Sequence, residues 1–355
     1  MDQFRLLKKT RQITEYSCGA SALQAVLSYW GKDVDETELM KLLHTTSEVG
    51  TYPEGIVQGA RALGFKADAK DNLTLDEVER FTAQGHPMVA LAQVWRSHKD
   101  RNRRAEDEWD SGHYIVVLKV DKDYVYFEDP YVRMSKAFMP RKQFEDHWHH
   151  SMGGDVQNNP KLMHVGIFVR GEKPAERKAV KDLKFEALDF LRFGSFNLIV
   201  TQLRGALLPY DLLNEMRDLF KTGAVRPDAF ICLRKDKGGN ISAIEGSSLQ
   251  EEEDMAEVNA LLAAVTSRSV GAPKSARSKA EAAIQAAAAG DFGLSADDIH
   301  KIAEKLPPDH TALIVLFENV WERKFKEIAK KYDGAIINQR LISPQALAKL
   351  ASELT

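Results

Sequence analysis

The sequence predicts two successive domains: an α+β domain, then an α/β domain of the open-sandwich, ferredoxin-like type. Helical apolar spacing dominates the first ninety or so residues, and short apolar or β-branched runs dominate residues 88–169, which predicts the α+β domain. Strand-like and helix-like segments alternate from residue 197 onward, which predicts the α/β domain. We place the first domain at residues 1–172, a charged linker at 173–192 and the second domain at 193–355, and expect the halves to fold separately.

Apolar spacing and capping residues predict the helices of the first domain. Apolar residues recur at helical spacing over Cys18–Trp30. Capping boxes at Asp35 and Thr74 each open a further helix, and Pro53 starts a short one. A last helix is predicted near Gln143–His150.

Short runs rich in apolar and β-branched residues predict the strands of this domain. A tight turn at residues 121–123 joins two of them into a hairpin, and the polar stretch Arg96–Gly112 is expected to be an exposed loop. The predicted strands are Met88–Trp95, His113–Val120, Tyr124–Glu128 and Met163–Val169.

The second domain repeats both patterns in alternation. Ser267–Gly290, rich in Ala, Ser and Lys, is interpreted as a mobile or loosely helical insertion. The predicted strands are Asn197–Leu203, Asp228–Arg234, Ile241–Glu245, Thr311–Phe317 and Ala335–Arg340, and the predicted helices are Pro209–Lys221, Ala296–Lys305 and Trp321–Tyr332.

Composition and charge exclude several classes of function. The net charge of −3 argues against nucleic acid or an anionic membrane as a constant partner, and no apolar stretch is long enough to span a bilayer. Two cysteines, Cys18 and Cys232, make a disulfide framework unexpected, so a cytoplasmic location is predicted. His147, His149 and His150 lack a cysteine or carboxylate at zinc spacing and are interpreted as a solvated helix end. No metal or cofactor is therefore predicted.

Cys18 is the candidate nucleophile. It stands at the start of a predicted amphipathic helix and is followed by Gly19. The positive end of the helix macrodipole favours the thiolate, which is the reactive form of the side chain. A single intracellular cysteine is more often a small buried hydrophobe, so Cys18 needs supporting residues before it is assigned to catalysis.

Three further residues supply that support. His113 opens a strand and Asp129 ends the next one, so a hairpin would place the carboxylate beside the imidazole and fix its tautomer. Gln12 lies six residues before Cys18 and can donate to an oxyanion beside the sulfur. Taken separately, His113 could be an ordinary core histidine and Asp129 part of an ordinary Asp-Pro turn. The occurrence of all four residues in this order favours a catalytic site instead.

These residues carry a resemblance to a known family. The run Gln12-Ile-Thr-Glu-Tyr-Ser-Cys18-Gly19-Ala20, with His113-Tyr-Ile-Val-Val and Asp129-Pro130, resembles the bacteriocin-processing, double-glycine cysteine peptidases over residues 3–170. Phe144 and Trp148 also fit the pattern of that family. The resemblance implies a papain-like fold, with the cysteine on a helical lobe and the histidine and aspartate on a β lobe.

The resemblance also implies a thiol protease that cleaves after a Gly-Gly leader, with a peptide or protein as substrate. Gln12 would assist the oxyanion, Cys18 would attack, His113 would act as base and then as acid, and Asp129 would orient the imidazole. The best-known members are fused to a membrane-spanning exporter and its ATPase. No membrane span follows here and no Gly-x-x-x-x-Gly-Lys-Ser/Thr loop is present, so processing coupled to export is not expected.

Other functions remain open on the same residues. A non-catalytic papain-like binding or scaffold module would keep the fold without turnover, and an acyltransferase would use the same thioester. The second domain weakly resembles a small α/β family of unknown function, through Asp228–Leu233, Thr311–Glu318 and Gly334–Gln339. It offers a surface for a protein partner, and Cys232 within it is expected to belong to the core.

Overall fold

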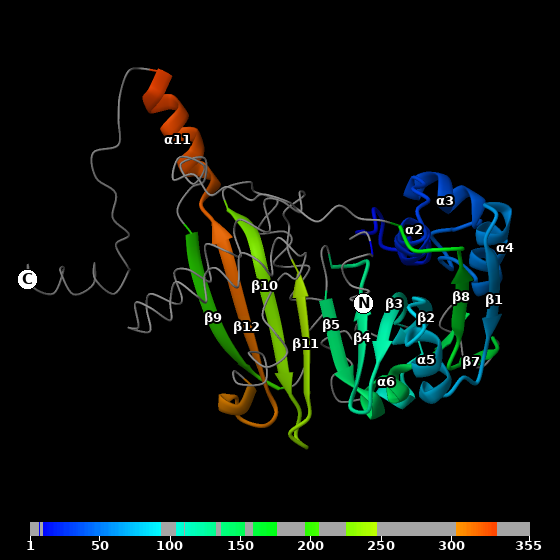
Figure 1. Cartoon of the computed structure of the whole chain (residues 1–355). Helices are drawn as coiled ribbons and strands as arrows, with labels where there is room; N and C mark the ends of the chain where they lie inside the picture. Colours follow the sequence, from blue (N-terminus) through cyan, green and yellow to red (C-terminus); the bar gives the residue numbers. More distant parts are fainter. Residues whose placement is uncertain are drawn as a thin grey trace, which may run out of the picture.

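A ten-stranded sheet runs through the part of the chain that the computed structural model describes: residues 7, 10–93, 104–109, 111–132, 136–152, 159–175, 196–205, 225–246 and 303–331 (Figure 1). The strands of this sheet are β1 (Lys66–Lys70), β2 (Met88–Gln93), β3 (Gly112–Val120), β4 (Tyr124–Glu128), β5 (Lys136–Pro140), β8 (Gly166–Arg170), β9 (Phe196–Arg204), β10 (Arg226–Lys235), β11 (Ile241–Gly246) and β12 (His310–Glu318). Along the sheet they follow the order β1-β8-β2-β3-β4-β5-β11-β10-β12-β9, and each neighbouring pair is antiparallel.

Helices cover the first half of this sheet on both faces. They are α2 (Cys18–Tyr29), α3 (Glu36–Leu42), α4 (Pro53–Ala62), α5 (Leu75–Thr82) and α6 (Arg141–His147), with a short 3-10 helix at Ala105–Asp107. In the second half, α11 (Val320–Lys331) follows the strand β12. Two short strands, β6 (His149–Ser151) and β7 (Lys161–Met163), pair with each other outside the large sheet.

Strand β3 lies at the centre of the first half, between β2 and β4. Tyr114, Val116 and Leu118 pack into an apolar core with α2, α3 and α4. Ile115 and Val117 point the other way, into a second core with α5 and α6. Because both faces of β3 are buried, the strand reads in the sequence as a continuous apolar run without polar alternation.

The predicted helix starts are confirmed, with one difference in detail. At Thr74 the capping box is complete: the Thr74 hydroxyl accepts from the Glu77 N–H at 3.3 Å, and the Glu77 carboxylate accepts from the Thr74 N–H at 2.9 Å. At Asp35 the carboxylate accepts from the Thr37 N–H at 2.8 Å, one residue earlier than a capping box requires. Both caps satisfy N–H groups that a helix start leaves unpaired.

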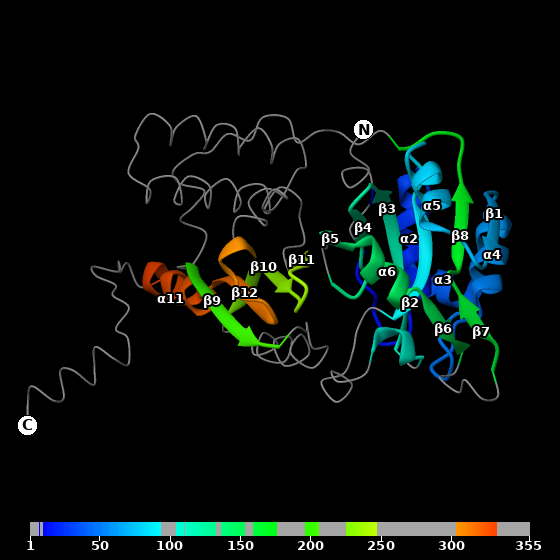
Figure 2. The same cartoon turned by 90° about the horizontal axis from the view of Figure 1, so that it is seen from below.

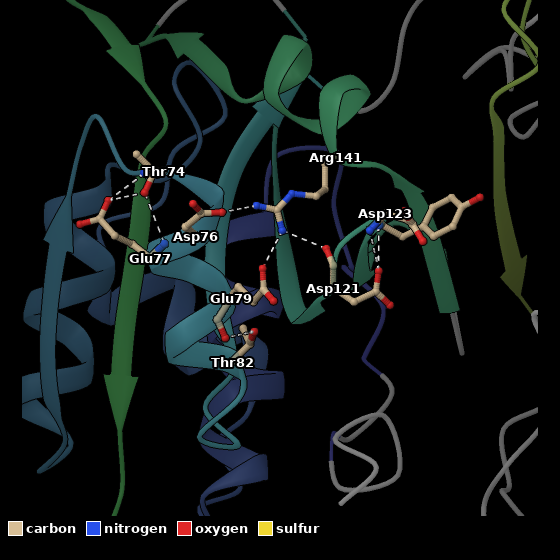
Figure 3. Close-up of polar contacts among 9 residues, drawn as sticks. Thr74, Asp76, Glu77, Glu79, Thr82, Asp121, Asp123 and Arg141 are labelled. Carbon is tan, nitrogen blue, oxygen red and sulfur yellow. Dashed lines mark hydrogen bonds and ion pairs between the residues drawn. The ribbon is translucent and has the colours of Figure 1, made fainter.

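Arg141 ties three segments of the first half together (Figure 3). Its guanidinium donates to the carboxylates of Glu79 at 2.7 Å and Asp76 at 2.5 Å, both on α5. It also donates to the Asp121 carbonyl at 2.9 Å, in the turn between β3 and β4. The Asp121 carboxylate accepts from the Asp123 N–H, so the predicted tight turn is confirmed. The planar fork of arginine suits this bridging role, since its donors point in fixed and different directions.

Burial of Trp148 accounts for one wrong prediction. The helix expected to reach His150 ends at His147, because Trp148 leaves the helical region with ψ 64°. The Trp148 side chain is fully buried, stacks on the ring of His164 and donates from Nε1 to the Val165 carbonyl at 2.9 Å. Packing of this large side chain thus overrides the helical spacing of the segment, and the next residues form β6.

Three other strands differ from the sequence pattern. The strand predicted over Met163–Val169 is interrupted at His164, where φ is +48°, so that it becomes β7 and β8. Neither β1 nor β5 was predicted, since β1 is built from Lys, Ala and Asp and β5 ends in Pro140. Both lie beside a stronger strand, and pairing with β8 and β4 determines their conformation where intrinsic propensity is low.

The sheet continues from the first half into the second. Strand β11 pairs with β5, with Ala243 opposite Phe138, and Figure 2 shows the two strands side by side. The apolar core on the α5–α6 face also continues, because side chains of β10, β11 and β12 belong to it. At the end of β11, a Cβ added to Gly246 would stand 2.4 Å from Cγ1 of Val132. The two halves therefore share both a hydrogen-bonded ladder and a core.

Several predictions for the second half lie outside the described residues. They concern the helix at 209–221, the strand at 335–340 and the insertion at 267–290, together with most of the linker at 173–192. Strands β9 to β12 and helix α11 confirm the other predicted elements, except that only the end of the helix predicted at 296–305 is described. The ferredoxin-like arrangement is not confirmed, and the division at residues 172 and 193 stays a prediction. In the part of the chain described above, no helix combines the length and apolar character needed to cross a bilayer.

We expect a chain truncated at Gly171 to be poorly soluble. The truncation removes β11, which leaves the edge of β5 unpaired and uncovers apolar side chains of the shared core. Size-exclusion chromatography and binding of a hydrophobic dye, each compared with the full chain at equal concentration, measure the effect. A monomeric truncated protein with no added dye binding would contradict the shared core and favour separate folding.

Candidate active site

Cys18 is the first residue of α2, as the sequence predicts. Ser17 precedes it as the N-cap, and the first turn of the helix contains no acidic residue. Cys18 is only 9% exposed, so most of the residue is covered by the protein. A Cβ added to Gly19 would stand 2.8 Å from Cβ of Thr51 and 3.1 Å from Cδ2 of Tyr114, which explains why glycine follows the cysteine. The close contact fixes the helix start, and the thiol with it, against the neighbouring elements.

His113 and Asp129 form a buried pair beside this helix start. The His113 Nε2 lies 2.7 Å from the Asp129 Oδ1, and the Asp129 side chain is fully buried. The same Oδ1 accepts from the Tyr131 N–H at 2.8 Å, which holds the carboxylate in place. The pairing of β3 with β4 accounts for the geometry, because Asp129 directly follows the end of β4 at Glu128.

The charges of this group determine the protonation of His113. Burial disfavours the imidazolium, but the negative charges of Asp129 and Cys18 outweigh burial and raise the pKa of His113 to about 10. The Cys18 thiol is thus close enough to the imidazole to contribute to this rise in pKa. Because Nε2 is occupied by Asp129, Nδ1 is the ring nitrogen available to the sulfur. The arrangement favours an imidazolium beside Cys18 at neutral pH.

Tyr114 contributes a neutral hydrogen bond to the same region. Its hydroxyl donates to the Thr51 carbonyl at 2.9 Å. Burial, together with the charges of Cys18 and Glu54, raises the pKa of Tyr114 well above its ordinary value. The phenol therefore remains protonated and anchors the loop before α4 to β3 without adding a charge.

Gln12 lies on the segment that leads into α2 and is bound to the turn after Asp129. Its N–H donates to the Pro130 carbonyl at 2.8 Å, and its Nε2 donates to the Thr14 carbonyl at 2.8 Å. Since Nε2 carries two hydrogens, one donor remains for a ligand. The Oε1 atom is buried without a hydrogen-bond partner among the described residues. A pocket here is lined by Arg11, Gln12, Ile13, Thr14, Glu15 and Tyr131.

Two of the three neighbouring histidines are buried and the third is half-buried, so the prediction of a solvated helix end is wrong. His147 and His149 are 8% and 3% exposed, and they bond to the carbonyls of Gln93 and Glu108. The third, His150, packs so closely on Gly112 that a Cβ there would stand 2.2 Å from its Nδ1. Among the residues described, no group of three or more His, Cys, Asp or Glu side chains could hold a metal ion.

Two residues that the sequence reasoning missed support the start of β3. Gln93 is fully buried at the end of β2, where its Oε1 accepts from the Ser111 N–H at 2.8 Å and its Nε2 lies 3.1 Å from the His150 Nδ1. Tyr131 packs edge-on against the His113 ring, with the ring centroids 6.4 Å apart. The sequence contains a signal for each of them: Gln93 is a polar residue at the end of an apolar strand, and Tyr131 is an aromatic residue two positions after Asp129.

A cysteine at a helix N-terminus, in range of a buried histidine–aspartate pair, defines the class of cysteine peptidase-like domains. Residues 7–152 match the model of the Peptidase C39 family. This part of the chain is a Peptidase C39 family domain, homologous to bacteriocin-processing peptidase domains, which confirms the resemblance found in the sequence.

Individual relatives cover only part of the chain. It is 27% identical over 139 residues to the pediocin PA-1 transport/processing ATP-binding protein PedD of Pediococcus acidilactici, covering 39% of this chain and 17% of PedD. It is 30% identical over 141 residues to the probable functional amyloid protease FapD of Pseudomonas fluorescens, covering 36% of this chain and 51% of FapD. The solved peptidase domain of Streptococcus ComA matches at 20% identity with a TM-score of 0.34, over 47% of this chain and 99% of that domain.

Cys18 and Cys232 are expected to differ strongly in reactivity. Cys232 is fully buried in β10, as predicted, and burial raises the pKa of its thiol, whereas Cys18 lies beside an imidazolium. At pH 6 we expect iodoacetamide to modify Cys18 at least about ten-fold faster than Cys232 in the folded protein. Peptide mass spectrometry measures both rates, and denatured protein, in which the two cysteines react alike, is the control. Equal rates in the folded protein would contradict the site geometry.

Removing the Asp129 charge is expected to lower the pKa of His113. Asp129→Asn keeps the size of the side chain but removes the negative charge that offsets the effect of burial on the imidazolium. The pKa of His113 is therefore expected to fall from about 10 to the ordinary value of a histidine or below it. The His113 ring resonances, followed by NMR as a function of pH, give the midpoint. Asp123→Asn, in an exposed turn, is the matched control and leaves it unchanged. An unchanged midpoint in Asp129→Asn would exclude the carboxylate as the cause.

Proposed function

We propose that the chain is a cytoplasmic cysteine peptidase that cleaves a peptide or peptide-like amide bond through an acyl-thioester on Cys18. The observation that carries the proposal is the buried pair beside Cys18: the His113 Nε2 lies 2.7 Å from the Asp129 Oδ1, and Cys18 acts on the same imidazole, whose pKa it helps to raise. The C39 family match supports the reaction class, because that family includes peptidases.

The proposed reaction has two stages. In the first, the Cys18 thiolate attacks the carbonyl carbon, and the oxyanion accepts from the Cys18 N–H and the Gln12 amide. His113 then gives its proton to the leaving amine, and the C–N bond breaks to leave the thioester. In the second, His113 takes a proton from water as the water oxygen attacks the thioester carbonyl. The carboxylic acid product leaves, and the thiolate–imidazolium pair is restored. Throughout, Asp129 keeps the imidazole oriented.

A peptide with Gly-Gly before the scissile bond is the first candidate substrate. The relatives are named as transport/processing proteins, one of them for pediocin PA-1, and as a probable functional amyloid protease, which supports a polypeptide substrate. The buried thiol supports the same choice. Cys18 is only 9% exposed, and glycine residues at the cleavage position would approach it with the least steric hindrance.

The second half is proposed to bind a protein partner. Its strands extend the peptidase sheet, and the pocket beside the site is lined only by residues of the first half. Binding of a partner on the second half is therefore compatible with an unobstructed site.

Cleavage of synthetic peptides containing Gly-Gly tests the proposal. We expect Cys18→Ala to abolish cleavage, Cys232→Ala to retain it, and Gln12→Ala to lower kcat by about 10²–10³-fold, as loss of an oxyanion donor does. Mass spectrometry of products formed in ¹⁸O-labelled water distinguishes the reactions. Label in the new carboxylate supports hydrolysis, transfer of the acyl group to an added amine would indicate an acyltransferase, and bound but uncleaved peptide would indicate a binding module.

A further inference from the structure

The segment that carries Gln12 is held by polar bonds rather than by packing. Its side chains contribute little to a core, and Ile13, for example, is 60% exposed. Three successive N–H groups instead reach three different elements. They are the Gln12 N–H to the Pro130 carbonyl at 2.8 Å, the Ile13 N–H to the Glu36 Oε1 at 3.0 Å, and the Thr14 N–H to the Ser17 Oγ at 3.0 Å.

Glu36 stands out among these acceptors because a carboxylate is costly to bury. Glu36 is the first residue of α3 and is only 4% exposed. Burial raises the pKa of Glu36, while hydrogen bonds from Ser17 and from the Ile13 N–H lower it. A glutamate that only complements the helix dipole can remain in solvent, as the exposed Glu38 does in the same turn. The hydrogen bond that Glu36 accepts from the segment before Cys18 therefore accounts for its burial.

We propose that Glu36 is a positioning residue of the active site, whose carboxylate fixes the Ile13 N–H and thereby holds the adjacent Gln12 amide in its place beside the reacting carbonyl. The inference rests on the proposed function, because it assigns Gln12 to the oxyanion. Glu36 itself touches neither substrate nor thiol, and it acts through the backbone. Ser17, the residue that precedes Cys18, is bound to the same segment separately, because its hydroxyl accepts from the Thr14 N–H at 3.0 Å and donates to the Thr14 carbonyl at 3.2 Å.

The connection has a direct kinetic consequence. Displacement of a catalytic donor by about 1 Å lowers a rate by about 10²-fold even where binding is unaffected. We therefore expect Glu36→Ala in the full chain to lower kcat by about 10²-fold on a peptide substrate, with KM and the alkylation rate of Cys18 nearly unchanged. Glu36→Gln keeps an oxygen that can accept from the Ile13 N–H and is expected to retain most of the activity. Glu38→Ala is the matched control on the exposed face of the same helix turn.

A double-mutant cycle separates positioning from a general loss of stability. If Glu36 acts through Gln12, the double variant Gln12→Ala with Glu36→Ala has the kcat of Gln12→Ala alone. If the two effects multiply, or if Cys18 alkylation slows in parallel with kcat, Glu36 is only a structural residue and the proposal is overturned. Should Glu36→Ala fail to fold, Glu36→Met fills the same volume without an acceptor and is judged by the same cycle.

Hydrogen exchange at the Ile13 amide tests the bond without any substrate. Glu36→Ala is expected to accelerate this exchange by about ten-fold or more, whereas Glu38→Ala leaves it unchanged. If the wild-type chain cleaves no peptide, the proposed function fails and the exchange result still decides whether Glu36 holds the segment. Unchanged exchange in Glu36→Ala would overturn the positioning role even in an active enzyme.

Discussion

The antiparallel pairing of β3 with β4, inside two apolar layers, is the constraint on which the rest of the structure depends. It fixes the register that brings Asp129 at the end of one strand to His113 near the start of the other. The paired strands supply a rigid frame for both side chains, and a buried ion pair needs such a frame to offset the loss of hydration. Helix α2 packs on the same strand, so the thiol at its first residue meets the imidazole as a result of core packing.

The buried charges of the site support one another. Asp129 would be costly alone, yet it accepts from both His113 and the Tyr131 N–H. His113 is in turn stabilised as a cation by two negative neighbours, which outweigh its own burial. The neutral groups around them, such as the Tyr114 hydroxyl and the Gln93 amide, hold the backbone without adding charge. A site of this kind exposes little surface and relies on preorganised contacts for its chemistry.

The sequence was sufficient where local chemistry determines structure. The capping box at Thr74, the β3–β4 hairpin and the four candidate residues all followed from spacing and residue type, and the structure brings Cys18, His113 and Asp129 together. The sequence was insufficient where contacts between distant segments determine the structure. Glu36 shares the buried stripe of α3 with Leu39, but only the fold reveals that the Ile13 N–H lies above it. Likewise, the pairing of β11 with β5 joins segments a hundred residues apart in the chain, and no local pattern encodes it.

That pairing has a geometrical consequence for anything the second half binds. Neighbouring strands are spaced about 4.8 Å apart, and five such steps separate β3 from β12 in the sheet order. Measured along the sheet, the distance is roughly 24 Å, which an extended peptide covers with about seven residues. Because a continuous ladder of hydrogen bonds joins β3 to β12, any group bound to the outer strands of the second half would be held at a nearly fixed distance from His113.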